Sequence, residues 1–174
     1  IALLPTVTVA VFAGLTINVG LEGWFSDRVR NVVGASLEAA EAYEAEQKRD
    51  LQIDAEALAR FVESATRGPF VPTDGELRQL LGQGQSQIQR GLREAYVIDG
   101  SGEIRARGIG SSWAFNYEEP SQAGLDRARE GETVVIEDWD INEFRALVEL
   151  AGLGERYLYV TRAVDGDLLA LLDD

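Results

Sequence analysis

The sequence predicts an α+β fold in which a long N-terminal helix packs on a five-stranded antiparallel sheet. Up to about residue 92, apolar residues recur at a spacing of three to four, which is typical of helices. Beyond that point they alternate singly in short runs separated by turn residues, which is typical of antiparallel strands. The chain has 174 residues, and domains usually contain about 100 to 200 residues, so we expect essentially one folded domain.

Residues 1–22 are predicted to form a membrane-spanning helix. The first 21 residues contain no charged side chain and 14 of them are apolar, and about 20 apolar residues cross a bilayer core. Trp24 and Phe25 follow where interfacial aromatic residues are expected. The alternatives are a buried core helix or the apolar region of a signal peptide. Because Ile1 is not a Met, we expect the chain to be part of a longer or processed protein.

The charge of the following segment predicts the side of the membrane on which the rest of the chain lies. Residues 22–50 contain seven acidic and four basic side chains, whereas cytoplasmic flanks are enriched in Lys and Arg. We therefore expect residues 23–174 to lie outside the cytoplasm. A stalk helix is predicted to continue over residues 23–50, and dimerisation is predicted along residues 22–45.

Two further helices are predicted before the sheet. Asp54 is a candidate N-cap of a second helix, which Gly68 and Pro69 would end. Thr73 and Glu76 have the spacing of a capping box, which predicts that another helix begins there.

The remaining elements alternate between strands and one crossover helix. A strand over residues 95–98, a turn at 99–102 and a returning strand at 103–107 form a predicted hairpin. A loop (108–120) and a helix (121–130) follow. Three more strands (133–138, 143–150 and 156–163) and a short exit helix (166–172) complete the chain.

The composition excludes several classes of chemistry. The chain contains no His, Cys or Met, so it lacks the usual zinc ligands, the His of a catalytic triad and any disulfide. We therefore expect no cofactor, no metal and no enzymatic activity within this chain. The net charge of −14 argues against nucleic acid as a partner, because phosphate binding needs a basic surface.

Two short motifs resemble ligand-binding loops without completing them. Asp138-Trp-Asp-Ile-Asn142, with Glu149 further on, has part of the spacing of a calcium loop. Glu143 stands where that loop requires Gly, so we interpret the segment as a hairpin turn. Gly82-Gln-Gly84 and Gly108-Ile-Gly110 lack the context of a phosphate loop, and we interpret them as loop glycines.

A small-molecule site is predicted over one face of the sheet. Arginine can bind a carboxylate through two hydrogen bonds and aromatic side chains can form pocket walls. The alternative is that the aromatic residues are core residues and the arginines are solvated. The candidate ligand-binding residues lie in or beside the segment joining strands two and three and on the later strands, and they are Arg107, Trp113, Tyr117, Arg145 and Tyr159, with Phe115 beside them.

The sequence resembles known proteins at two levels, first in its fold and then in its family. The long helix, the order of the strands and the Tyr-Val-Ile-Asp-Gly-Ser-Gly-Glu-Ile run at 96–104 resemble the Cache (PAS-like) extracytoplasmic sensor fold. The segments LLPTVTVAVFAGLTINVGLEGWFSDRVRNVVGASLEAAEAY at 3–43 and RYLYVTRAVDGDLL at 156–169 resemble NtrY-type nitrogen-regulation sensor histidine kinases of proteobacteria. Gly166 departs from that family, where Pro is expected.

The resemblance implies the extracytoplasmic module of a kinase in the bacterial inner membrane, with its soluble part in the periplasm. HAMP, PAS and kinase domains would follow in the cytoplasm, with an NtrX-type response regulator as partner and a homodimer as the working form. The resemblance names no ligand, and our own expectation from the candidate site is a small molecule or a periplasmic protein. Two alternatives stay open: a ligand-free periplasmic interaction or dimerisation module, and the sensor domain of a chemoreceptor or cyclase.

Overall fold

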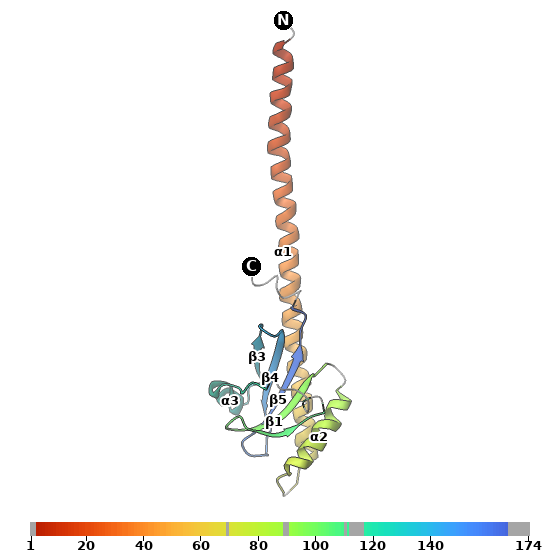
Figure 1. Cartoon of the computed structure of the whole chain (residues 1–174), viewed down its shortest axis with the longest axis vertical. Helices are drawn as coiled ribbons and strands as arrows, with labels where there is room; N and C mark the ends of the chain where they lie inside the picture. The colour runs from red at the N-terminus through yellow and green to blue at the C-terminus, as the bar shows by residue number, and fades with distance from the viewer. Residues whose placement is uncertain (1–2, 69, 89–90, 110, 112–116, 167–174) are drawn as a thin grey trace. The chain divides into compact units, whose positions relative to one another are not determined.

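The structure is a computed structural model that describes residues 3–68, 70–88, 91–109, 111 and 117–166, with side chains from residue 34 onward. These residues form three helices and five strands (Figure 1). In chain order they are α1 (Leu3–Ala65), α2 (Asp74–Gln87), β1 (Glu94–Asp99), β2 (Ile104–Arg107), α3 (Gln122–Arg129), β3 (Val134–Asp138), β4 (Glu143–Glu149) and β5 (Arg156–Ala163).

The five strands form one antiparallel sheet in the order β2-β1-β5-β4-β3. Two hairpins, β1–β2 and β3–β4, are joined through β5, which pairs with both β1 and β4. Helix α3 is the crossover between β2 and β3, so the last strand returns to the middle of the sheet. The predicted fold class, a helix with a five-stranded antiparallel sheet, is confirmed.

Helix α1 is a single helix, and the prediction that a second helix begins at Asp54 is wrong. No Gly or Pro interrupts residues 35–65, and the helix continues to Ala65. Asp54 is an interior residue of α1, and its Oδ2 accepts a hydrogen bond from Arg162 Nη2 of β5 at 2.5 Å. The acidic residue that suggested a helix start is instead a buried partner of the sheet.

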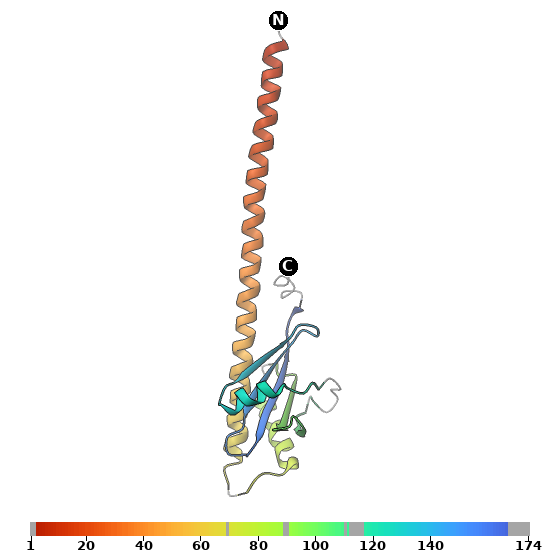
Figure 2. The same cartoon turned by 90° about the vertical axis from the view of Figure 1, so that its left-hand side faces the viewer.

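Residues 44–65 of α1 cover one face of the sheet. Leu51, Leu58 and Val62 are fully buried, and Lys48 lies over the ring of Phe144 at 5.8 Å from its centroid. Helix α2 covers the β1–β2 end of the sheet. Helix α3 lies against the opposite face (Figure 2). There Leu125 and Ala128 join a core with Tyr96, Leu147 and Tyr159. The sheet is therefore covered by helices on both faces.

The capping box predicted for α2 is confirmed. Thr73 is the N-cap, the backbone N–H of Glu76 donates to its hydroxyl, and Glu76 accepts from the Thr73 N–H at 2.7 Å. Gly82 and Gly84, however, lie inside α2 and not in a loop. A Cβ on Gly84 would lie 2.4 Å from Leu58 Cδ1, so this glycine permits the close approach of α2 to α1.

Both predicted hairpin turns are confirmed. Asp99 accepts hydrogen bonds from the backbone N–H groups of Ser101 and Glu103 at 3.0 and 3.1 Å, which closes the β1–β2 turn. Residues 139–142 form the β3–β4 turn, and Asn142 has a positive φ of 52° there, a conformation that asparagine tolerates better than most residues.

No helix is long and apolar enough to cross a membrane within the part of the chain whose side chains the structure describes. The predicted membrane segment, residues 1–22, lies outside that part. The predicted exit helix over residues 166–172 lies outside it as well, apart from Gly166.

Candidate functional site

The candidate site lies on the face of the sheet that α3 partly covers. Residues directly opposite each other in an antiparallel pair share a face. Tyr159 of β5 is opposite Tyr96 of β1 and Leu147 of β4, and Thr161 of β5 is opposite Arg145. Strand register therefore collects tyrosine, arginine and threonine side chains from three strands on one surface.

Four of the five predicted site residues are described, and they lie on or beside this surface. Arg145 and Tyr159 lie on β4 and β5. Arg107 lies at the end of β2, with its guanidinium 5.8 Å from the ring centroid of Tyr96. Tyr117 lies in the segment between β2 and α3 and packs on the same core. Trp113, together with Phe115, lies outside the described residues.

Three tyrosines form the apolar part of the site. The ring centroid of Tyr117 is 5.3 Å from that of Tyr96 and 6.0 Å from that of Tyr159, and both pairs are edge-to-face. The Tyr117 hydroxyl donates a hydrogen bond to the Gly102 carbonyl oxygen at 2.5 Å. Burial raises the pKa of Tyr159 to about 12, so the phenol is neutral near pH 7.

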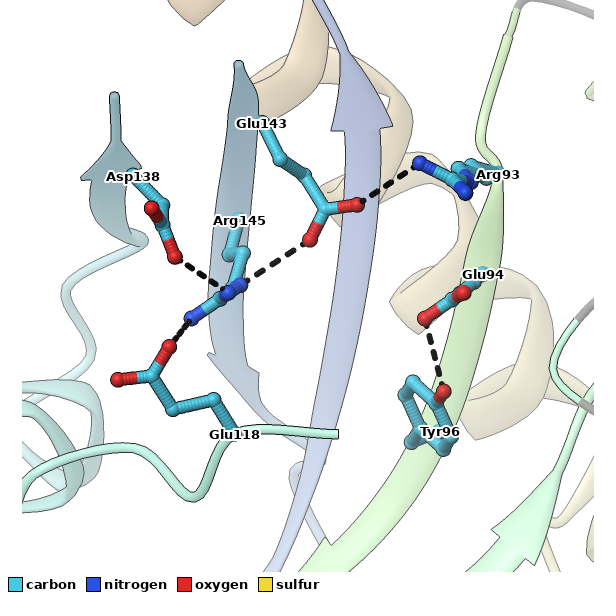
Figure 3. Close-up of polar contacts among 7 residues, drawn as sticks. All are labelled: Arg93, Glu94, Tyr96, Glu118, Asp138, Glu143 and Arg145. Atoms are coloured by element: carbon cyan, nitrogen blue, oxygen red, sulfur yellow. Dashed lines mark hydrogen bonds and ion pairs between the residues drawn. The ribbon is translucent and has the colours of Figure 1, made fainter. Parts of the chain in front are cut away.

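Arg145 is the centre of the polar part of the site (Figure 3). Its guanidinium contacts three carboxylates: Nη1 lies 2.6 Å from Glu118, Nη2 lies 2.6 Å from Asp138, and Nε lies 3.1 Å from Glu143. Burial opposes the charged form, but the hydrogen bond to Glu118 and those from the other partners outweigh it, so the pKa of Arg145 is raised. Arg145 therefore stays cationic, with each of its nitrogens engaged by a carboxylate of the protein.

Further polar residues extend this arrangement across the face. Arg93 lies 3.7 Å from the second oxygen of Glu143, and Glu94 accepts a hydrogen bond from the Tyr96 hydroxyl at 2.8 Å (Figure 3). The prediction from sequence missed Glu94, Glu118 and Glu143 as members of this group. The signal available in the sequence was the strand alternation, since Glu143 and Arg145 are two residues apart and share a face.

A groove opens beside Arg145 at the β3–β4 hairpin. Its volume is about 660 Å³, and the residues that line it are Glu118, Ile136, Glu137, Asp138, Trp139, Asp140, Ile141 and Arg145. Ligand sites usually occupy ~300 to 1,000 Å³. Trp139 and Ile141 are among the exposed large apolar side chains of the described residues, so the groove combines apolar walls with carboxylates.

The calcium-like motif belongs to this hairpin and has a different role. Asp138 binds Arg145 and pairs with Glu143 in the β3–β4 register, whereas Glu149 lies at the other end of β4, opposite Tyr157. Among the described residues, no group of three or more His, Cys, Asp or Glu side chains is placed to hold a metal ion.

Comparison with known proteins gives a consistent family assignment. A family model described as the NtrY N-terminal region matches residues 1–173. An NtrY-like sensor histidine kinase of Rickettsia felis is 26% identical over 182 residues, which cover 99% of this chain and 28% of the relative. The nitrogen regulation protein NtrY of Azorhizobium caulinodans is 25% identical over 175 residues, covering 99% of this chain and 22% of the relative.

The fold has a counterpart among solved structures. The sensor domain of the V. cholerae histidine kinase DctB superposes with a TM-score of 0.50 at 11% sequence identity, covering 85% of this chain and 60% of that chain. This likeness confirms the predicted sensor-domain fold. The chain itself spans about a quarter of the length of the curated relatives it matches.

Proposed function

The chain belongs to the family of NtrY N-terminal regions, and from this premise we propose that it is the extracytoplasmic sensor domain of a membrane-bound two-component histidine kinase linked to nitrogen regulation. The match over residues 1–173 carries the proposal. The chain contains no His, so the phosphoacceptor His of such a kinase would lie in the remaining three quarters of the protein. The soluble part of this chain, residues 23–174, would lie in the periplasm of a bacterium and be anchored in the inner membrane through residues 1–22.

The site would act by favouring one of two arrangements of the domain. A ligand shifts such an equilibrium only by binding one arrangement more tightly than the other. We propose that the ligand contacts the face of the sheet that carries Arg107, Tyr117, Arg145 and Tyr159, with Trp113 as a further candidate contact. Helix α1 is the element that would transmit the change, because its residues 44–65 are bound to the sheet and the same helix extends back to Leu3.

The experiment uses the full-length protein in membranes together with an NtrX-type response regulator. Autophosphorylation and phosphotransfer are measured for the intact protein and for a version that lacks residues 44–167. The intact version should respond to the growth medium's nitrogen source, and the deleted version should have a fixed output. Equal responses from both would refute the sensor role.

Dimerisation along residues 22–45 is part of the proposal. Sedimentation equilibrium of the whole chain in detergent should give a mass twice that of the monomer, which is 19.0 kDa. A chain that remains monomeric at every concentration would exclude a dimer formed by this region alone.

A second candidate function is a ligand-free module that binds another periplasmic protein. The observation that favours it is a pair of exposed apolar side chains after α1, Phe70 at 85% and Val71 at 72% exposure, beside a groove of about 370 Å³. The double variant Phe70→Ser/Val71→Ser separates the two functions. Loss of the kinase response in that variant, with an unchanged response in Arg145→Gln, would favour the interaction module.

A further inference from the structure

Three buried polar residues form a row across one end of the three middle strands of the sheet. Thr161 of β5 is opposite Glu94 of β1 and opposite Arg145 of β4, and Glu143 lies two residues before Arg145 on the same face. The exposed fractions of Glu94, Thr161 and Glu143 are 6%, 2% and 4%. The threonine is therefore directly opposite the buried Glu94, whereas Glu143 is opposite Ala163 and lies diagonal to Thr161.

The hydroxyl of Thr161 has no hydrogen-bond partner in the part of the chain that the structure describes. Nearby, Glu94 accepts one hydrogen bond, from the Tyr96 hydroxyl, and no cation of the described residues pairs with it within 4 Å. Buried polar groups are normally hydrogen-bonded, and a buried charge without an opposite charge costs free energy. This row therefore has an unused hydroxyl and unused carboxylate lone pairs on one surface.

The charge of the surroundings selects the ligand. Four carboxylates, of Glu94, Glu118, Asp138 and Glu143, share this surface with the guanidinium groups of Arg93 and Arg145 (Figure 3) and with that of Arg107 beside Tyr96. An anion would enter a region of net negative charge and would find the nitrogens of Arg145 already bound to carboxylates. A divalent metal is not favoured either, because the described residues contain no group of acidic ligands placed for one.

We propose that this row binds the primary ammonium group of a small organic cation. An ammonium group donates three hydrogen bonds, which matches one oxygen each from Glu94, Glu143 and the Thr161 hydroxyl. Arg145, whose Nε meets Glu143, also lines the groove at the β3–β4 hairpin, and the apolar part of the ligand would lie toward Ile136, which is opposite Arg145 and packs on the tyrosine core. This inference rests on the proposed sensor function and names its ligand class.

The test compares three four-carbon probes that carry ammonium, hydroxyl or carboxylate groups at their ends. Isothermal titration calorimetry measures the binding of 1,4-diaminobutane, 1,4-butanediol and succinate to the whole chain. The diammonium probe should bind, and the diol and succinate should bind at least tenfold more weakly. Binding of succinate but not of the amine, or binding of none of the three up to 10 mM, would overturn the inference.

Two variants locate the bound amine. Glu94→Gln keeps the shape of the side chain and removes its charge, and it should weaken amine binding about tenfold or more, because a charge-assisted hydrogen bond is lost. Thr161→Val should weaken it several-fold. The matched control is Glu130→Gln, which removes the same charge from an exposed residue of the α3 C-terminus and should leave binding unchanged.

Equal binding by Glu94→Gln and the wild type would also overturn the inference, because the amine would then sit elsewhere. Thermal unfolding of each variant establishes that it is folded before binding is compared. Since calorimetry involves no kinase reaction, a negative result here leaves the response of the full-length protein to be judged by its own experiment.

Discussion

Two glycines of helix α2 should respond to the same substitution in opposite directions. In Gly84→Ala, the added Cβ would lie 2.4 Å from Leu58 Cδ1 and 3.0 Å from Phe61 Cδ1, whereas carbon atoms in contact are ~3.5 to 4.0 Å apart. Leu58 is fully buried, so it has to shift within a filled core. In Gly82→Ala, the nearest atom is Ile109 Cγ1 at 3.2 Å, and Ile109 is 65% exposed and free to move.

The magnitudes follow from two opposing terms. Replacing Gly by Ala within a helix stabilises it by about 0.5 to 1 kcal/mol. Overpacking a core costs about 1 to 3 kcal/mol, and a contact more than 1 Å too short belongs in the upper half of that range. Gly84→Ala should therefore lower the free energy of unfolding by about 1 to 2 kcal/mol, and Gly82→Ala should raise it by up to about 1 kcal/mol.

Thermal unfolding followed by circular dichroism distinguishes the two outcomes. For a domain of this size 1 kcal/mol corresponds to about 2 to 4 °C, so Tm should fall by about 2 to 8 °C in Gly84→Ala and rise slightly in Gly82→Ala. Removing most of the Leu58 side chain should abolish this fall in Tm, so that Gly84→Ala no longer destabilises the domain in a Leu58→Ala background. A Tm that rises equally for both single variants would refute the close packing of α2 on α1.

Three further perturbations test other contacts. Asp54→Ala should destabilise the domain by about 3 to 5 kcal/mol, because the buried Arg162 loses its ion pair with Asp54, and Asp54→Leu/Arg162→Met should recover most of that loss in urea unfolding. The Thr73 backbone N–H, followed by its hydroxyl, lowers the pKa of Glu76 from 4.5; the cap's contribution is therefore complete above pH 4.5 and is lost as pH falls through the lowered pKa, a dependence that should vanish in Glu76→Gln. Tyr117→Phe should cost about 0.5 to 1.5 kcal/mol in urea unfolding, through the lost hydrogen bond to the β1–β2 turn.

Most of the secondary structure follows from local patterns in the sequence. The turn at Asp99 and the capping box at Thr73 depend on residues within four positions of each other, so their geometry is encoded locally. The predicted helix start at Asp54 failed for the opposite reason. The Asp54 carboxylate pairs with Arg162, which is 108 positions away. The sequence alone does not distinguish an Asp that caps a helix from an Asp that forms a long-range ion pair.

The candidate site was only partly predictable for a similar reason. Strand alternation places Arg145 and Tyr159 on definite faces of their own strands, but the pairing of β5 with both β1 and β4 decides which residues become neighbours. Thr161 gains Glu94 and Arg145 as neighbours only through that pairing. The carboxylates that engage Arg145 were therefore missed, and with them the reason why a carboxylate ligand fits this face poorly.

Strand β5 connects the proposed site to helix α1. Thr161 faces the proposed ammonium site, and the next residue, Arg162, points to the other face and binds Asp54 of α1. A ligand that moves β5 on one face therefore moves this ion pair on the other. Both side chains of the pair are 7% exposed, whereas Lys48 and Glu137, which also join α1 to the sheet, are 29% and 35% exposed and are more strongly screened by salt.

The buried pair is therefore expected to transmit the signal, and its removal separates binding from response. Asp54→Leu/Arg162→Met in the full-length protein should bind 1,4-diaminobutane with unchanged affinity, since neither residue faces the site. Its kinase output should no longer change on binding, while the exposed-pair variant Lys48→Gln should keep the response. A normal response in the double variant would mean that the sheet moves α1 through its apolar contacts, with Leu51, Leu58 and Val62 as the residues to change next.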